Sequence, residues 1–195
     1  MTHQNLATTG RIAVWDRFVR VFHLALILGV ACAYVTSQAG MQQTHVRVGY
    51  FLIGLITARL IWGVIGSRHA RFSDFLYPPR IILRHVQAIL SGHPPRHLGH
   101  DPAGGAMIAL MLAMLTVILS AGLLLQGTLE FSGPLQAVQM EDRWVYLLRG
   151  LHVTLVNIFS GLVVMHITGV LVVSVLSREN LTWAIFSGYK KRRTQ

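Results

Sequence analysis

Four histidines lie within long apolar segments of this 195-residue chain or at their edges: His23, His45, His152 and His166. An ionisable group inside an apolar segment is costly to bury and usually has a functional reason to be there. Neutral imidazole is also a common metal ligand and a proton carrier. These four side chains therefore predict a site for metal binding or proton transfer.

The spacing of His152 and His166 is the most informative feature of the set. Fourteen residues of α-helix turn through about 1400°, which is within about 40° of whole turns, so both rings leave the same helix face. At 1.5 Å per residue the two rings lie about 21 Å apart along the axis. One helix is therefore expected to present one imidazole at each of two levels.

The elements that must position these rings are four apolar stretches, at about 18–36, 45–65, 106–126 and 151–176. Each can cross a hydrocarbon layer of about 30 Å, which takes about 20 helical residues. The chain is 53% hydrophobic and only 12% charged, whereas soluble proteins contain about 25% charged residues. We expect an all-α integral membrane protein, a four-transmembrane-helix bundle forming one domain over 1–195. This composition excludes a disordered chain, a secreted disulfide scaffold and a soluble nucleic-acid-binding protein.

The net charge of +10 is distributed unevenly along the chain. The N-terminal segment (through Arg20), the long loop at about 66–105 and the basic tail at 177–195 together carry thirteen Lys and Arg residues, whereas the opposite side carries three: Arg47, Arg143 and Arg149. Because cytoplasmic loops hold an excess of Lys and Arg, we expect both termini and the long loop in the cytoplasm. Within that loop, 79–90 is predicted to form a short amphipathic helix on the membrane surface. The loop also holds five histidines that we expect to be solvated: His69, His85, His93, His97 and His100.

This orientation sets the level of each histidine in an apolar segment. His23 and His166 fall near the cytoplasmic side, and His45 and His152 fall near the other side. Two imidazoles that face each other across a bundle can bind one iron from both sides, and haem is the cofactor that uses such axial pairs. Zinc is favoured less, because its sites take three or four protein ligands and each level offers two. The chain has no C-x-x-C-H sequence, so a haem would be held non-covalently.

Three arginines are candidates for binding the propionates of such a cofactor. Arg59 lies fourteen residues after His45, on the same helix face but at the cytoplasmic level, where an unpaired guanidinium would be costly. Arg20 and Arg47 lie near the two surfaces. Simpler interpretations stay open: Arg59 can reach the interface along its aliphatic stem, and a single histidine can form a helix-to-helix hydrogen bond. Phe159, midway between the histidines of the fourth stretch, is expected to be a packing residue.

The chain resembles the bacterial cytochrome b561 family and the related b-type cytochrome subunits of nickel-iron hydrogenases, over nearly its whole length. The motifs that carry the resemblance are 14–23 (VWDRFVRVFH), 45–50 (HVRVGY), 59–63 (RLIWG), 66–67 (GS), 99–105 (GHDPAGG), 151–152 (LH), 166–169 (HITG), 177–181 (SRENL) and 188–190 (GYK). Together these motifs are specific, whereas each alone is weak.

The resemblance implies a four-helix membrane bundle that encloses two non-covalent b haems. The axial histidines of the family fall on the first, second and fourth spans, and they correspond here to His23, His45, His152 and His166. The family transfers electrons between membrane quinone and a partner redox protein in the bacterial inner membrane, as part of the respiratory chain.

Three functions remain open from the sequence. The first is an electron-transfer subunit that exchanges electrons with the quinone pool and with a c-type cytochrome or another redox protein; whether it forms a homo-oligomer is left open. The second is a superoxide:quinone oxidoreductase acting alone, for which Arg47, Arg143 and Arg149 would attract the anion while nearby acidic residues partly cancel them. The third is a haem-free bundle that handles metal ions or protons.

Overall fold

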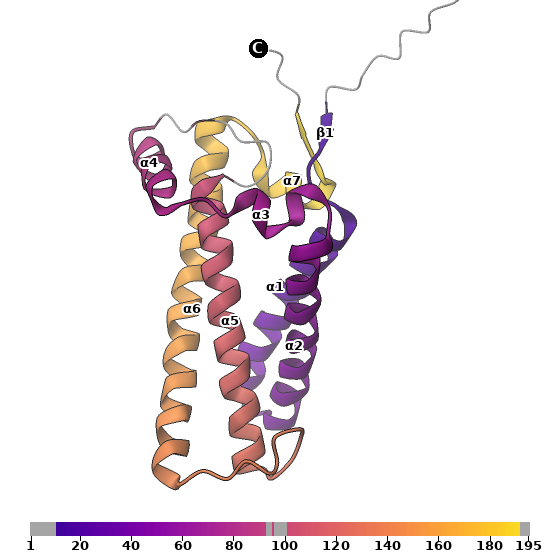
Figure 1. The fold of residues 1–195 in the computed structure, drawn as a ribbon, viewed down its shortest axis with the longest axis vertical. Coiled ribbons are helices and arrows are strands. Elements are labelled where there is room, and N and C mark those ends of the chain that lie inside the picture. The colour runs from indigo at the N-terminus through magenta and orange to yellow at the C-terminus, as the bar shows by residue number, and fades with distance from the viewer. Residues whose placement is uncertain (1–10, 93–94, 96–100, 192–195) are drawn as a thin grey trace, which may run out of the picture.

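Four helices that are long and apolar enough to cross a membrane run side by side in the computed structural model (Figure 1). They are α1 (Arg17–Gln38), α2 (Gln42–Ile65), α5 (Pro102–Leu129) and α6 (Asp142–Ser177). The structure describes residues 11–92, 95 and 101–191. All four apolar stretches form helices, which confirms the expected helical class with four candidate membrane-spanning segments.

Two of the long helices begin at aspartate caps that precede the apolar stretches. α1 starts after Asp16, whose Oδ1 accepts a hydrogen bond at 2.7 Å from the N–H three residues on. α5 starts at Pro102, after Asp101 accepts a hydrogen bond at 2.9 Å from the N–H of Gly104. Aspartate at the cap and proline at the first helical position are both strongly favoured there. The capping residues therefore make these helices longer than the apolar pattern predicts.

The long helices form two antiparallel pairs that meet through one shared contact. α1 packs on α2, α5 packs on α6, and α2 joins the pairs by packing on α5. Extended packing between α1 and α6 is absent from the described part of the chain. The buried core lies between these helices and is made of Phe22, Ile56, Leu112, Leu115, Ile118 and Phe159. Phe159 is thus a core residue, as expected, and it is the one buried residue of α6.

The outward faces of the long helices carry large apolar side chains that are open to the surroundings. Val21 on α1, Val64 on α2 and Val175 on α6 are each exposed over more than two thirds of their surface. A water-soluble protein rarely exposes contiguous apolar surface on this scale. A hydrocarbon environment makes it favourable, because the helices satisfy their own backbone hydrogen bonds. The outer surface therefore supports a membrane location.

The two chain ends meet at one end of the bundle, which we call the α4 end (Figure 1). Strand β1 (Arg11–Ala13) pairs antiparallel with β2 (Tyr189–Lys191), and helix α7 (Leu181–Ser187) precedes β2. The N–H of Val14 donates to the carbonyl of Gly188 at 2.9 Å, and the guanidinium of Arg20 donates to the carbonyl of Phe186. The sequence analysis did not predict this ribbon, because each strand has only three residues.

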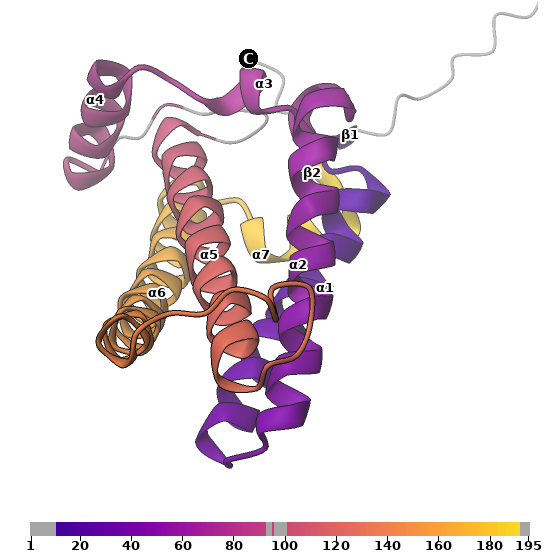
Figure 2. The same cartoon turned by 60° about the horizontal axis from the view of Figure 1, so that its bottom comes forward.

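The long loop forms three short helices at this same end of the bundle. They are η1 (Arg68–Ala70), α3 (Phe72–Phe75) and α4 (Pro79–Leu90). The predicted amphipathic helix is confirmed as α4, which lies beside the start of α5 and across the long axis of the bundle (Figures 1 and 2).

The expectation that the loop histidines are solvated is wrong for His85. Its ring is 4% exposed, and its Nε2 lies 3.2 Å from Oδ1 of Asp101, because the apolar side of α4 packs on α5 beside that carboxylate. His69 is also paired, with its Nδ1 2.9 Å from Oδ2 of Asp74. The other three loop histidines lie outside the described residues.

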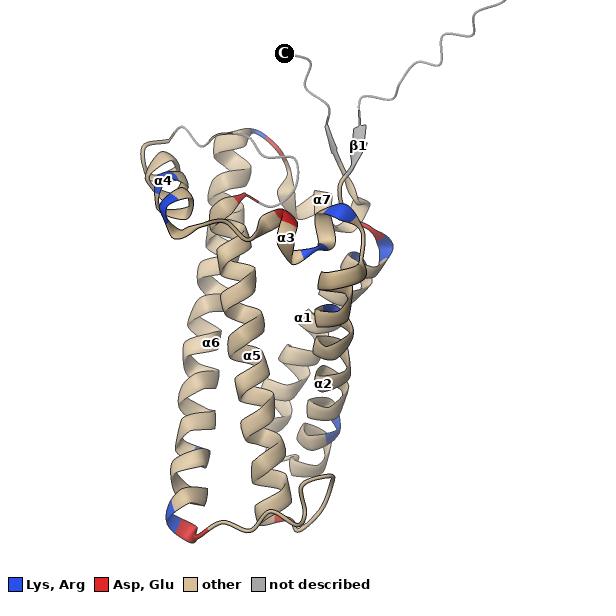
Figure 3. Cartoon of the chain, viewed as in Figure 1, with Lys and Arg blue, Asp and Glu red and all other residues tan. Residues whose placement is uncertain are grey.

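Charged side chains gather at the two ends of the bundle (Figure 3). Most of the described arginines lie at the α4 end, including Arg68, Arg71, Arg80 and Arg84 in the folded loop. The long middle sections carry almost no charge, as a membrane-spanning segment requires. The exception is Arg59, which lies within α2.

Candidate functional site

Two of the four predicted histidines face each other at the end of the bundle opposite α4. His45 lies in the first turn of α2, and His152 lies in the third turn of α6. Their ring centres are 6.4 Å apart, and the ring planes are nearly perpendicular, at 83°. The structure therefore brings together the pair that the sequence assigned to one level.

Each of these rings is fixed by a hydrogen bond to a neighbouring helix. Nδ1 of His45 lies 2.9 Å from the carbonyl oxygen of Ala33 in α1, and Nδ1 of His152 lies 3.0 Å from the carbonyl oxygen of Ile118 in α5. A carbonyl oxygen only accepts, so each Nδ1 carries the proton and donates it. In a neutral ring with this orientation the lone pair resides on Nε2, and this is the tautomer that can bind a metal through Nε2.

The separation of the two rings suits one shared metal ion. Two metal–imidazole bonds of about 2 Å each, added to the distance from each ring centre to its bonded nitrogen, give about the observed separation of the two ring centres. Gly122 on α5 makes room for His152, because a Cβ at that position would lie 3.2 Å from Cε1 of the ring. All four long helices thus contribute to this level. The rings come from α2 and α6, the accepting carbonyls come from α1 and α5, and α5 also supplies Gly122 beside His152.

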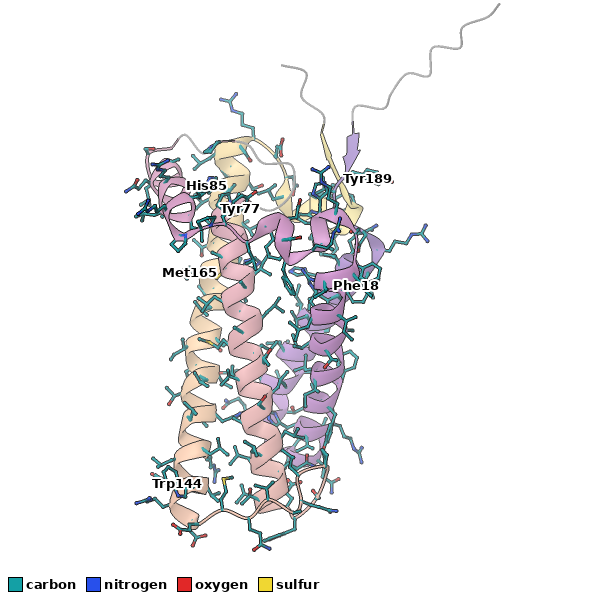
Figure 4. All side chains as sticks on the ribbon, viewed as in Figure 1. Phe18, Tyr77, His85, Trp144, Met165 and Tyr189 are labelled. Atoms are coloured by element: carbon teal, nitrogen blue, oxygen red, sulfur yellow. The ribbon has the colours of Figure 1, made fainter. Side chains whose placement is uncertain are left out.

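The other two histidines lie closer to the α4 end and also interact. His23 on α1 lies within electrostatic range of His166 on α6. Both rings are half-buried, whereas residues beside them in the sequence, Val21, Met165 and Ile167, are exposed. Figure 4 shows Met165 on the outer side of α6. The rings of His23 and His166 therefore face the bundle interior rather than lipid, across the side where α1 and α6 do not pack on each other.

Arg59 is the most deeply buried charged residue of the described segments, with 3% of its surface exposed. Its Nη2 donates to the carbonyl of Ala70 at 3.2 Å, and its guanidinium lies 5.1 Å from the ring centre of Phe72. Its Nη1 is buried without a hydrogen-bond partner among the described residues. A buried cationic donor left unpaired is strongly unfavourable. An additional acceptor is therefore expected next to Arg59, at the level of His23 and His166.

The sequence analysis missed Asp16, which organises this end of the bundle. Its Oδ2 accepts hydrogen bonds from the indole N–H of Trp62 at 3.0 Å and from the hydroxyl of Ser67. Burial acts to raise the pKa of Asp16, but hydrogen bonds to Ser67, the Val19 N–H and Trp62, together with the nearby Arg59, outweigh it and lower the pKa below its usual value. An aspartate directly before an apolar helix is a cap signal, but the long-range partners have no local signal.

A second polar cluster closes the opposite end of the bundle. The hydroxyl of Tyr50 donates to Oε1 of Gln126 at 2.6 Å, which links α2 to α5. Nε2 of Gln42 donates to Glu130 at 3.3 Å. These bonds hold the loop after α5 against the start of α2, close in sequence to His45. The sequence analysis did not find this cluster either.

The remaining predicted residues are placed less centrally. Arg20 turns toward α7, where it binds the carbonyl of Phe186, and its Nε is buried without a partner among the described residues. Arg47 is exposed on α2. Their assignment to a cofactor stays a prediction.

The sequence model of the prokaryotic cytochrome b561 family matches residues 14–188. The chain belongs to this family. The match spans all four long helices and confirms the resemblance seen in the motifs. No curated protein and no solved structure matches the chain. A cytochrome b561 is a membrane b-type cytochrome that binds b-type haem and takes part in electron transfer.

The residues of this cytochrome b561 suit a b haem better than a metal ion alone. Within 11–92, 95 and 101–191, no three His, Cys, Asp or Glu side chains gather closely enough to hold a metal ion. Haem iron needs only two protein ligands, because the porphyrin supplies the others. The oriented pair His45 and His152 meets that need at one level. At the other level, the unpaired Nη1 of Arg59 suits a carboxylate of a haem.

We expect the Asp16→Asn variant to be less stable than the wild type at neutral pH, and the difference to disappear in acid. The lowered pKa means that the carboxylate stabilises the fold above the unfolded pKa of about 3.9, and that this contribution is lost as the pH falls through the folded pKa. Thermal unfolding of both proteins in detergent, measured across acid and neutral pH, tests this. A stability difference that is unchanged in acid would contradict a role for the charge.

Proposed function

We propose that this cytochrome b561 binds two b haems, one at each histidine level, and passes electrons between them across the bacterial inner membrane. His45 and His152 are the proposed axial ligands of one haem, and His23 and His166 those of the other. The observation that carries the proposal is the pair of rings 6.4 Å apart whose Nδ1 atoms both donate to backbone carbonyls. With Nδ1 of each ring donating to a carbonyl, Nε2 is the nitrogen of each ring that would bind the iron.

The residues of the chain would hold the cofactors and control their surroundings. A bound haem supplies reversible one-electron chemistry at iron, and two histidine ligands suit outer-sphere electron transfer because no ligand position has to open. The backbone carbonyls of Ala33 and Ile118 fix the ring orientation and make the imidazoles more basic. Phe159 and the core around it exclude water between the two levels, about 21 Å apart along α6.

Arginine side chains are the proposed partners of the propionates. Arg59 is assigned to the haem between His23 and His166, because its buried Nη1 lacks an acceptor at that level. Arg20 is assigned to the same end, and Arg47 to the opposite surface. A guanidinium and a carboxylate form a charge-assisted hydrogen bond, which also favours the reduced iron electrostatically.

The direction of insertion and the redox partners complete the proposal. The excess of arginine at the α4 end supports a cytoplasmic location for that end and for both termini. Electrons would pass between the membrane quinone pool at one end and a c-type cytochrome or another redox protein at the other. The whole chain then acts as one membrane domain of a respiratory pathway.

Alanine substitutions of the histidines test the pairing. We expect His152→Ala and His166→Ala each to reduce the haem content from two per chain to one. The double variant His45→Ala/His152→Ala should also retain one haem, because both ligands serve the same iron. The cross-level double variant His23→Ala/His152→Ala should retain none. Haem content per chain is measured by the pyridine haemochrome spectrum.

His69→Ala is the matched control, since this loop histidine is bound to Asp74 and lies outside the bundle core. It should keep both haems. A wild-type protein without a reducible b-type spectrum would eliminate haem binding and favour the haem-free alternative. Retention of one haem in the cross-level double variant would show that the pairs are wrong.

The role of Arg59 is tested by reduction potentials. Arg59→Gln removes a positive charge and should lower the potential of the haem between His23 and His166, by up to roughly 60 mV, which corresponds to a tenfold change in a one-electron equilibrium. Asp16→Asn removes a negative charge and should raise the same potential. Arg59→Lys keeps the charge and should stay closer to the wild type. Spectroelectrochemical titration distinguishes the two haems, and identical curves for all four proteins would contradict the assignment.

A further inference from the structure

α4 presents apolar and basic side chains that the described residues leave exposed. Leu83 is 60% exposed and Leu90 is 82% exposed, and their seven-residue spacing places them on one side of the helix. Arg80 and Arg84 are also exposed, and they form the adjacent strip one turn apart. The opposite side of the helix carries the buried His85 (Figure 4).

The position of α4 is fixed at the boundary of the apolar layer. His85 Nε2 lies 3.2 Å from Oδ1 of Asp101, and Asp101 caps the first turn of α5. From Pro102 to Leu129, α5 contains no charged residue. The hydrocarbon layer can therefore begin immediately beyond the Asp101 cap. α4 lies across the bundle axis at this level (Figures 1 and 2), as a helix at a membrane surface does.

Exposed apolar residues toward the same end of the bundle indicate what covers the exposed leucines. Val175, near the end of α6, and Leu110, in the early part of α5, are exposed apolar residues on two of the membrane-spanning helices. If lipid covers these helices, it also reaches the level of α4 without a break. A lipid layer is therefore a better match for Leu83 and Leu90 than a protein partner, which would have to displace lipid from the same side.

The charge of the folded loop indicates which lipid. Its described residues, 66–92, contain four arginines and one acidic residue, Asp74. Asp74 already lies near Arg68 and His69, with an Nε–Oδ1 distance of 3.9 Å to the arginine. Within the described residues, neither Arg80 nor Arg84 forms a salt bridge. Anionic headgroups complement that pattern, and juxtamembrane basic residues are attracted to them.

We propose that α4 is an interfacial helix that binds anionic phospholipid headgroups through Arg80 and Arg84 while Leu83 and Leu90 enter the acyl layer. The His85–Asp101 pair positions the helix for this contact by tying it to α5. This lipid site is separate from the histidine levels and does not depend on the proposed haem ligands.

A fluorescent label on α4 tests the proposal in the full-length protein. Cys32 is the single cysteine of the chain, so Cys32→Ser combined with Leu90→Cys gives one site for a polarity-sensitive dye. The protein is reconstituted into vesicles of phosphatidylcholine alone or with phosphatidylglycerol. We expect blue-shifted emission and protection from the neutral aqueous quencher acrylamide when phosphatidylglycerol is present. The same label at Leu83→Cys, with Leu90 intact, checks that the result does not come from the lost leucine.

Removing the arginines should remove the lipid selectivity. Each basic residue near an anionic surface contributes about a fivefold factor to binding, so Arg80→Gln/Arg84→Gln should weaken the phosphatidylglycerol dependence by up to about thirtyfold. Arg143→Gln/Arg149→Gln removes two charges from the opposite end and should leave the label unchanged. Helical circular dichroism and elution volume confirm that each variant is folded.

Three outcomes would overturn the proposal. A label that is equally open to acrylamide in both kinds of vesicle would show that α4 does not enter the lipid. Protection that is the same with and without phosphatidylglycerol would show burial without headgroup recognition. Protection that appears only at high protein density, with crosslinks between labelled sites, would point to a second copy of the chain instead.

Discussion

An imidazole nitrogen inside an apolar bundle must have a hydrogen-bond or metal partner, and this requirement governs the arrangement of the whole protein. At the end opposite α4, the carbonyls of Ala33 and Ile118 accept hydrogen bonds from Nδ1 of His45 and His152. One nitrogen of each ring therefore has its partner within the protein. Ala33 belongs to α1 and Ile118 to α5, whereas the rings come from α2 and α6, so each ring ties two helices together. The two Nε2 atoms are the positions at which the proposed haem iron would bind.

The helix packing follows from the same requirement. The tight contacts run from α1 to α2, from α2 to α5 and from α5 to α6, whereas α1 and α6 lack extended packing in the described segments. The histidines come from three of these helices: His23 from α1, His45 from α2, and His152 and His166 from α6. Phe159 fills the interior between the levels, and it is the point at which α6 is anchored in the core. A bundle packed tightly on all four sides would leave no space for a planar cofactor.

The sequence predicted the features that depend on composition and helical spacing. The four apolar segments, the shared face of His152 and His166 and the level of Arg59 all follow from residue type and the 3.6-residue turn. The features it missed depend on contacts between distant parts of the chain. The local sequence identifies Asp16 as a helix cap. Its hydrogen bonds with Trp62 and Ser67 form only when α2 and the start of η1 fold back against the beginning of α1. His85 was expected to be solvated because its loop is polar, but α4 folds that loop onto α5 and buries the ring beside Asp101. The β1–β2 ribbon is too short for any pattern to reveal.

If each level holds one iron between two imidazoles, electron paramagnetic resonance of the oxidised wild-type protein will show it. Two strong axial nitrogen ligands keep ferric haem in the low-spin state. We expect two distinct low-spin ferric signals of similar intensity and no high-spin signal. A dominant high-spin signal, or a single low-spin species in a protein that contains two haems, would contradict it.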